Sequence, residues 1–139
     1  MKTLALTLAF ALTSILGYAQ DTEGTTITVT IENIKSNDGK VLLSLHTKDT
    51  FMKGPGVKNA ESKIEDGKVV ITFENVTPGE YAIMALHDKN ENNKMDFQDS
   101  GMPAEDYGTS NNVMTFGPPQ YDNSKFNVAD KPVELNIKF

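Results

Sequence analysis

Strict alternation of apolar and polar residues is the feature that most constrains the fold of this chain. Between residues 26 and 34 the apolar side chains Ile27, Val29 and Ile31 occupy every second position. A period of two places them on one face of a β-strand. Four further segments have the pattern of strands, and they span residues 40–47, 68–76, 80–87 and 133–139. Because no convincing helical period follows residue 20, the sequence predicts an all-β domain.

Turn sequences separate the predicted strands, and both faces of residues 80–87 are apolar, which predicts a central strand. The turns are Asn37-Asp38-Gly39, Asp66-Gly67 and Thr77-Pro78-Gly79. Two weaker strands are expected near residues 112–116 and 121–128, and residues 51–60 are expected to form a loop. These elements predict a single antiparallel β-sandwich of about seven strands with one long ordered loop.

The amino terminus has the pattern of a secretory signal peptide. Lys2 precedes an apolar run over residues 4–16, and Gly17 and Ala19 place small residues before a cleavage site. The run is shorter than the roughly 20 residues that a membrane-spanning helix needs, and it lacks the period of a buried amphipathic helix. We therefore expect residues 1–19 to be cleaved. Residues 20–139 would form one exported domain without a transmembrane segment, soluble in the periplasm or outside the cell.

The composition excludes several classes of function. The chain has 139 residues, a formal net charge of −6 and no cysteine. Without cysteine there are no disulfides, thiolate metal sites or cysteine nucleophiles. Nucleic-acid binding needs a basic surface, so nucleic acid is an unsuitable partner for this acidic chain. An exported domain without disulfides must hold its long loops by other means.

Residues 88–99 have the spacing of a calcium-binding loop. Side-chain oxygens occupy positions 1, 3, 5, 9 and 12 of a twelve-residue segment, and position 7 offers a backbone carbonyl. The residues at these six positions are Asp88, Asn90, Asn92, Lys94 (carbonyl), Asp96 and Asp99. Calcium takes six to eight oxygen ligands, so alternating short carboxylates and amides suit it. The sequence predicts a Ca²⁺ site with a dissociation constant on the order of 10⁻⁴ to 10⁻³ M.

Two features depart from the usual calcium loop. Position 6 holds Asn93 where glycine is usual, although asparagine is the next residue best able to adopt a left-handed conformation. Position 12 is Asp99 instead of a bidentate glutamate, and no helices flank the loop. Glu105, Asp106 or water would then complete the coordination. A solvated acidic turn and a different ion are the alternative interpretations.

A second group of polar residues follows in the same long segment. Glycines and prolines fix the backbone around Glu105, Tyr107, Ser110, Asn111 and Asn112. An aromatic ring beside amide and hydroxyl groups suits a carbohydrate or peptide of the cell envelope. The alternative is structural, with Tyr107 packing the loop against the domain and the asparagines capping its backbone.

Several motifs in the chain resemble those of one uncharacterised bacterial family. They are PGEYAIMALHDKNENNKMD, GMPAEDYGTSNN and the later Gly117-Pro118-Pro119. Through them the chain is identified as a member of the family called domain of unknown function 2141, over about residues 26–139. The resemblance implies an exported single-domain β-sandwich from bacteria with an outer membrane, without an established activity. The Pro-Gly-x-Tyr turn is also similar to prealbumin-like modules of surface adhesins and carboxypeptidase accessory domains. That likeness implies a prealbumin- or immunoglobulin-like sandwich and, through the adhesins, calcium.

An envelope hydrolase acting on glycan or peptide is the competing hypothesis. Its acid or base would be Asp88, Glu105 or His87, all in or beside the long loop. However, the chain has neither a Gly-x-Ser-x-Gly elbow nor a His-Glu-x-x-His pair. We expect both His46 and His87 to be structural. The sequence therefore favours a calcium-stabilised binding or structural module of the cell envelope over an enzyme.

Overall fold

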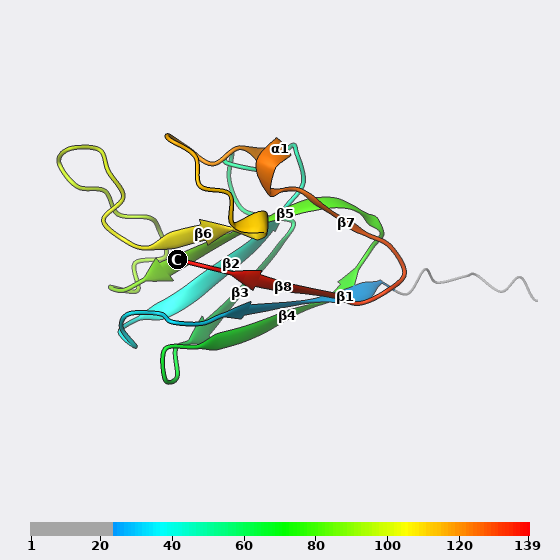
Figure 1. Ribbon diagram of the computed structural model, residues 1–139, viewed down its shortest axis with the longest axis horizontal. Coiled ribbons are helices and arrows are strands. Elements are labelled where there is room, and N and C mark those ends of the chain that lie inside the picture. Colours follow the sequence, from blue (N-terminus) through cyan, green and yellow to red (C-terminus); the bar gives the residue numbers. More distant parts are fainter. Residues whose placement is uncertain (1–23) are drawn as a thin grey trace, which may run out of the picture.

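Two packed β-sheets form the domain in the computed structural model, which describes residues 24–139 (Figure 1). This arrangement confirms the predicted β-sandwich. The predicted signal peptide, residues 1–19, lies outside the described residues. Among residues 24–139, no helix is both long and apolar enough to cross a membrane.

The smaller sheet has three strands in the order β4-β1-β8. They are β1 (Thr25–Ile31), β4 (Val69–Val76) and β8 (Val133–Ile137). β4 pairs antiparallel with β1, whereas β8 pairs parallel with β1. The sequence had predicted a purely antiparallel sandwich, and the parallel pair of β1 and β8 departs from that prediction. The parallel pair is possible because the whole larger sheet lies between β1 and β8 in the chain and supplies the long crossover that such a pair needs.

The larger sheet has five strands, four of them in the order β3-β2-β5-β6, with β7 pairing with β5. They are β2 (Lys40–His46), β3 (Lys58–Lys63), β5 (Gly79–Asp88), β6 (Tyr107–Thr109) and β7 (Phe126–Val128). β5 pairs with β2, β6 and β7, which confirms its predicted central position.

The core lies between the sheets and consists of the apolar residues at alternating strand positions. Ile27, Val29 and Ile31 of β1 are fully buried. They face the larger sheet, whose buried aliphatic side chains include Val41, Leu43, Leu45, Ile83 and Ala85. Burying one such aliphatic side chain contributes about 1.5–3 kcal/mol for valine, leucine or isoleucine, so this set provides the main drive for folding.

β3 was not predicted, because residues 51–60 were expected to form a loop. Its sequence, KNAESK, contains one apolar residue, and no position of the strand is fully buried. β3 is an edge strand, and charged side chains on such a strand discourage pairing with other chains. Lys40 of the neighbouring β2 forms an ion pair with Glu61 of β3, with the Nζ and Oε2 atoms 2.8 Å apart.

The two weaker strand predictions were wrong in part. Residues 112–116 form no strand; the 3₁₀ turn η1 (Ser110–Asn112) ends there and an irregular loop follows. Residues 121–128 begin as the short helix α1 (Tyr121–Ser124), and only their end forms β7. Met114 and Phe116 point to solvent, so the apolar residues that suggested a strand do not face the core.

The pairing of β5 with β6 positions the long loop. The chain leaves the sheet at Asp88, projects from the body as a hairpin-like loop, and returns as β6 beside β5 (Figure 1). The bond from the His87 backbone N–H to the carbonyl of Asp106, 2.9 Å, closes the base of this loop. Both ends of the long loop, which contains the predicted calcium loop, are thereby anchored on the β5-β6 pair.

Candidate functional site

Asp88, the first residue of the predicted calcium loop, is the last residue of β5 and is completely buried. Its two carboxylate oxygens accept the backbone N–H groups of Asn92 and Asn93, at 3.1 and 2.8 Å. Gly39, at φ 69°, lies so close that a Cβ there would overlap the Asp88 carbonyl. Asp88 therefore bends the loop back on itself and fixes its first turn against the sandwich.

Asn90 and Asn92 both converge on Asp96. The Nδ2 of Asn90 lies 2.7 Å from one carboxylate oxygen of Asp96. The Nδ2 of Asn92 lies 2.9 and 2.8 Å from the two oxygens. Four of the six predicted ligand residues are thus brought together by direct contacts, since Asp88 bonds the backbone of Asn92.

The backbone of this loop turns as the sequence predicts. Asn93, at position 6, has a φ of 63°, and Glu91, two residues earlier, has a φ of 57°. Asparagine tolerates this left-handed region better than most residues, and Glu91 does not share that tolerance. The expectation that Asn93 adopts a left-handed conformation is confirmed.

Glu105 holds the loop from the opposite side. Its side chain is buried, with 7% exposure, and its two oxygens accept the backbone N–H groups of Lys89 (2.9 Å) and Asp96 (3.2 Å). It therefore joins the second and ninth positions of the loop to the strand β6 that follows. The sequence offered Glu105 as an alternative ion ligand or as a contact for a partner, and no local pattern indicated its role as a backbone anchor.

Lys94 and Asp99 occupy more exposed positions. The Lys94 N–H donates to the side-chain oxygen of Asn92, at 3.1 Å. Asp99 lies in the exposed turn of residues 98–101, which is closed by the bond from Gly101 N–H to the Gln98 carbonyl, 2.8 Å. Among residues 24–139, no three Asp, Glu or His side chains form a group that could hold a metal by themselves. Any ion in the loop must therefore use amide and backbone oxygens as well.

The charges around the loop are only partly balanced. Lys40 lies opposite Asp88 in the register of β2 and β5. Its hydrogen bond to Glu61 raises the pKa of Lys40, and the nearby charges of Glu91 and Asp88 add to this effect. Lys35 and Lys89 form ion pairs with Asp106. Within the described part of the chain, no lysine forms an ion pair with Asp88 or Asp96.

The residues that follow β6 link β5 to the region of α1 through side-chain hydrogen bonds. Buried Ser110 accepts the N–H of Ile83 at 3.0 Å and donates to the carbonyl of Ser124. Asn111 donates to the carbonyls of two residues at the end of α1 and just after it, Asn123 and Lys125, at 3.1 and 2.9 Å.

Asn112 makes the corresponding contact with β8. Its amide bonds both the Asn136 carbonyl and the Lys138 N–H, each at 2.8 Å, as a neighbouring strand would. The side chains of Ser110, Asn111 and Asn112 therefore form hydrogen bonds with backbone groups. This agrees with the alternative interpretation, in which these residues have a structural role.

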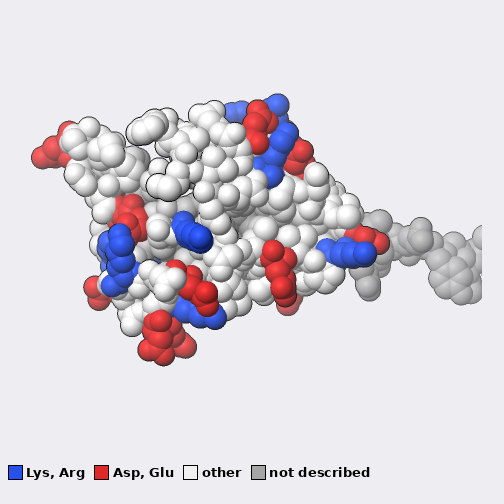
Figure 2. Space-filling view, in the orientation of Figure 1, with Lys and Arg blue, Asp and Glu red and all other residues white. Residues whose placement is uncertain are grey.

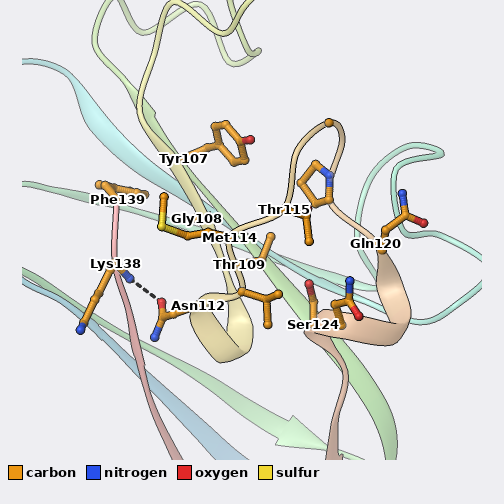
Figure 3. A pocket seen from close by; sticks show the side chains of 14 residues that line it. Tyr107, Gly108, Thr109, Asn112, Met114, Thr115, Gln120, Ser124, Lys138 and Phe139 are labelled. Atoms are coloured by element: carbon orange, nitrogen blue, oxygen red, sulfur yellow. Dashed lines mark hydrogen bonds between the residues drawn. The ribbon is translucent and has the colours of Figure 1, made fainter.

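Tyr107 lies in a different setting, beside a cavity of about 290 Å³ (Figure 3). The cavity opens where β6 of one sheet meets the end of β8 of the other, and the loop of residues 113–119 encloses it. Its apolar walls include Tyr107, Met114, Pro119 and Phe139. Of the predicted partner contacts, Tyr107 and Asn112 line this cavity, whereas Glu105 and Ser110 are buried elsewhere.

Both histidines are buried and packed. His87 Nε2 lies 2.8 Å from the carbonyl of Asp38, and the ring stacks on Phe139 at a centroid distance of 6.2 Å. His46 contacts Thr50 through Nδ1 and packs edge-on against Phe51. Burial lowers the pKa of His46. The groups offered as acid or base, Asp88, Glu105 and His87, are all buried, so this arrangement gives no support to the hydrolase hypothesis.

Comparison with known proteins gives one match. A family model described as "Uncharacterized protein conserved in bacteria (DUF2141)" matches residues 29–136. The matched range contains the predicted calcium loop of residues 88–99, Glu105 and the segment from Tyr107 to Asn112. No curated protein and no solved structure matches the chain significantly.

Proposed function

The chain belongs to the bacterial family of uncharacterised proteins DUF2141, and on that premise we propose that it is an exported β-sandwich whose loop of residues 88–99 binds Ca²⁺. The ion would stabilise a binding or structural module of the cell envelope. Export is supported by the sequence of residues 1–19, and the ion by the loop geometry.

The convergence of Asn90 and Asn92 on Asp96 carries the proposal. The oxygen and nitrogen of a carboxamide lie in nearly equivalent positions, and a half-turn of the amide exchanges them. That exchange would give up the bonds that the amide oxygens of Asn90 and Asn92 accept from backbone N–H groups, at 3.3 and 3.1 Å. In return, two amide oxygens would lie beside the carboxylate of Asp96 in place of two donors. Such a group of hard oxygen atoms repels itself unless a cation lies among them, and Ca²⁺ favours ligands of this kind.

The charge distribution supports a cation at the same place. Asp88 and Asp96 have hydrogen-bond donors but no lysine in an ion pair among residues 24–139. The proposed ligands are Asp88, Asn90, Asn92, Asp96 and the carbonyl of Lys94, with water completing the sphere. Asp99 lies on the exposed turn, so its predicted place in the sphere would require residues 98–101 to fold back.

The proposed consequence of binding is mechanical. Glu105 bonds the N–H of Asp96 and lies two residues before β6, so an ion that orders Asp96 also orders the start of β6. In a domain without cysteine, the ion would take the place of a disulfide as the clamp on a long loop. The carbohydrate or peptide partner stays a prediction of the sequence.

Thermal unfolding with calcium and with chelator tests this function. For a dissociation constant of 10⁻⁴ to 10⁻³ M, about 10 mM Ca²⁺ should raise the melting temperature by about 5–15 °C. Asp88→Ala and Asp96→Ala should abolish the rise. A wild-type melting curve that is identical with and without chelator would contradict the proposal.

A further inference from the structure

The loop of residues 113–119 exposes two large apolar side chains. Met114 is 97% exposed and Phe116 is fully exposed. Exposed apolar residues are common when they are single, but two large ones only two positions apart on one loop are a candidate contact surface. Gly117 follows Phe116 at a φ of 100°, and Pro118 and Pro119 then restrict the backbone at the end of this loop.

A cavity lies beside these exposed side chains. It has a volume of about 290 Å³, and its apolar walls include Tyr107, Pro119 and Phe139. An apolar cavity of about 150 Å³ is already large enough to accept benzene, so an aromatic ring fits in this one by volume. Met114 lies at the edge of the cavity, with its side chain toward Phe139 (Figure 3).

The same surface carries no acidic side chain, and Lys138 is the charged residue among those that line the cavity. Residues 107–120 contain no Lys, Arg, Asp or Glu, although 23% of the whole chain is charged. Figure 2 shows a mostly uncharged area between the acidic tip of the long loop and the charged side chains near α1, with a basic side chain below it. Two copies of a chain with a net charge of −6 repel each other in general, so a surface without acidic side chains is where they can approach.

We propose that the protein forms a two-fold dimer through this surface, with Phe116 of each copy entering the cavity of the other. A two-fold interface uses the same surface on both copies and must be self-complementary. Here one surface provides both the projecting ring and the cavity that can receive it. No part of this argument depends on calcium, so failure of the ion proposal would leave it standing, and the reverse also holds.

Analytical ultracentrifugation of residues 20–139, at about 1 µM to 1 mM in chelator and in calcium, tests the proposal. The expected result is a concentration-dependent rise in mass toward that of two chains in both buffers. Phe116→Ser should weaken association by about 100-fold or more, because each dimer loses two buried rings. Val70→Ser is the control. Val70 is 53% exposed on β4 and does not line the cavity, so this variant should associate like the wild type.

A fluorescence measurement locates the contact. The chain has no tryptophan, so Phe116→Trp introduces a single reporter. Its emission maximum should move to shorter wavelength as the concentration rises. A wild-type protein that stays monomeric to 1 mM would overturn the proposal and leave the surface to a different occupant. Association that is unchanged by Phe116→Ser, or equally weakened by Val70→Ser, would overturn it as well.

Discussion

The side-chain amide of Asn92 faces both carboxylate oxygens of Asp96, at 2.9 and 2.8 Å. The two residues are four positions apart. Asp88 accepts the N–H groups of Asn92 and Asn93 and so closes the turn that leads into this segment. This contact makes Asp96 the centre of the loop. Asp99, which the same spacing had grouped with Asp96, lies apart from this contact on the exposed turn of residues 98–101.

Asp96→Asn should weaken calcium binding by at least about 10-fold, because it removes one of two carboxylates around the ion. The stability in chelator should change little, since Asp96 is only partly buried and an asparagine oxygen can still accept one amide. Calcium titrations of the wild type and the variant measure the difference.

Asp99→Asn is the matched control for this prediction. It makes the same chemical change on the exposed turn of residues 98–101, and the affinity should stay within about two-fold of the wild type. If Asp99→Asn weakens binding as strongly as Asp96→Asn, Asp99 is a ligand and the turn closes over the ion.

Glu105→Gln should destabilise the domain by about 1–3 kcal/mol. Both oxygens of Glu105 accept backbone N–H groups, and glutamine offers one acceptor and a donor that would face the second N–H. Urea denaturation in chelator measures the effect without a contribution from the ion. A change below about 0.5 kcal/mol would mean that Glu105 does not anchor the loop.

Asn112 gives a prediction about backbone conformation. Its φ is 52°, and its amide bonds the carbonyl of Asn136 and the N–H of Lys138. Asn112→Ala loses these bonds and also strains the backbone, whereas Asn112→Gly loses only the bonds. The alanine variant should therefore be less stable than the glycine variant by about 1 kcal/mol in denaturant melts, and the reverse order would contradict this account.

His46 predicts a dependence of stability on pH. Burial lowers the pKa of His46 in the folded protein, so below the ordinary histidine pKa of about 6.5 the unfolded chain binds more protons than the folded chain. Its contribution to stability is complete above that pKa and is lost as the pH falls below it. Between about pH 6.5 and 5, the free energy of unfolding should fall more steeply for the wild type than for His46→Gln. Equal slopes would exclude His46 as the cause.

The alternation of apolar residues predicted the strands that supply the core, since burial of one face is what produces a period of two. β3 escaped prediction because an edge strand with both faces partly exposed leaves no such period. The reverse error occurred at residues 112–116, where Val113, Met114 and Phe116 are apolar but point to solvent. Composition shows which residues are apolar, but it does not show what covers them.

The candidate site was predictable to the extent that its residues are close in the sequence. The spacing of Asp88, Asn90, Asn92 and Asp96 indicated a common loop. The structure brings the side chains of Asn90, Asn92 and Asp96 together, and Asp88 bonds the backbone of Asn92. Glu105 and Asn112 act on residues 9 to 26 positions away, through bonds to backbone groups that any residue type would provide. Such contacts leave no pattern in the sequence, because they depend on how β5, β6 and β8 are arranged.

Calorimetric titration of residues 20–139 with CaCl₂ tests the central claim most directly. The account predicts one site per chain with a dissociation constant on the order of 10⁻⁴ to 10⁻³ M, and a loss of the binding heat in Asp88→Ala. The absence of binding heat for the wild type up to about 10 mM Ca²⁺, with an unchanged melting temperature, would contradict it.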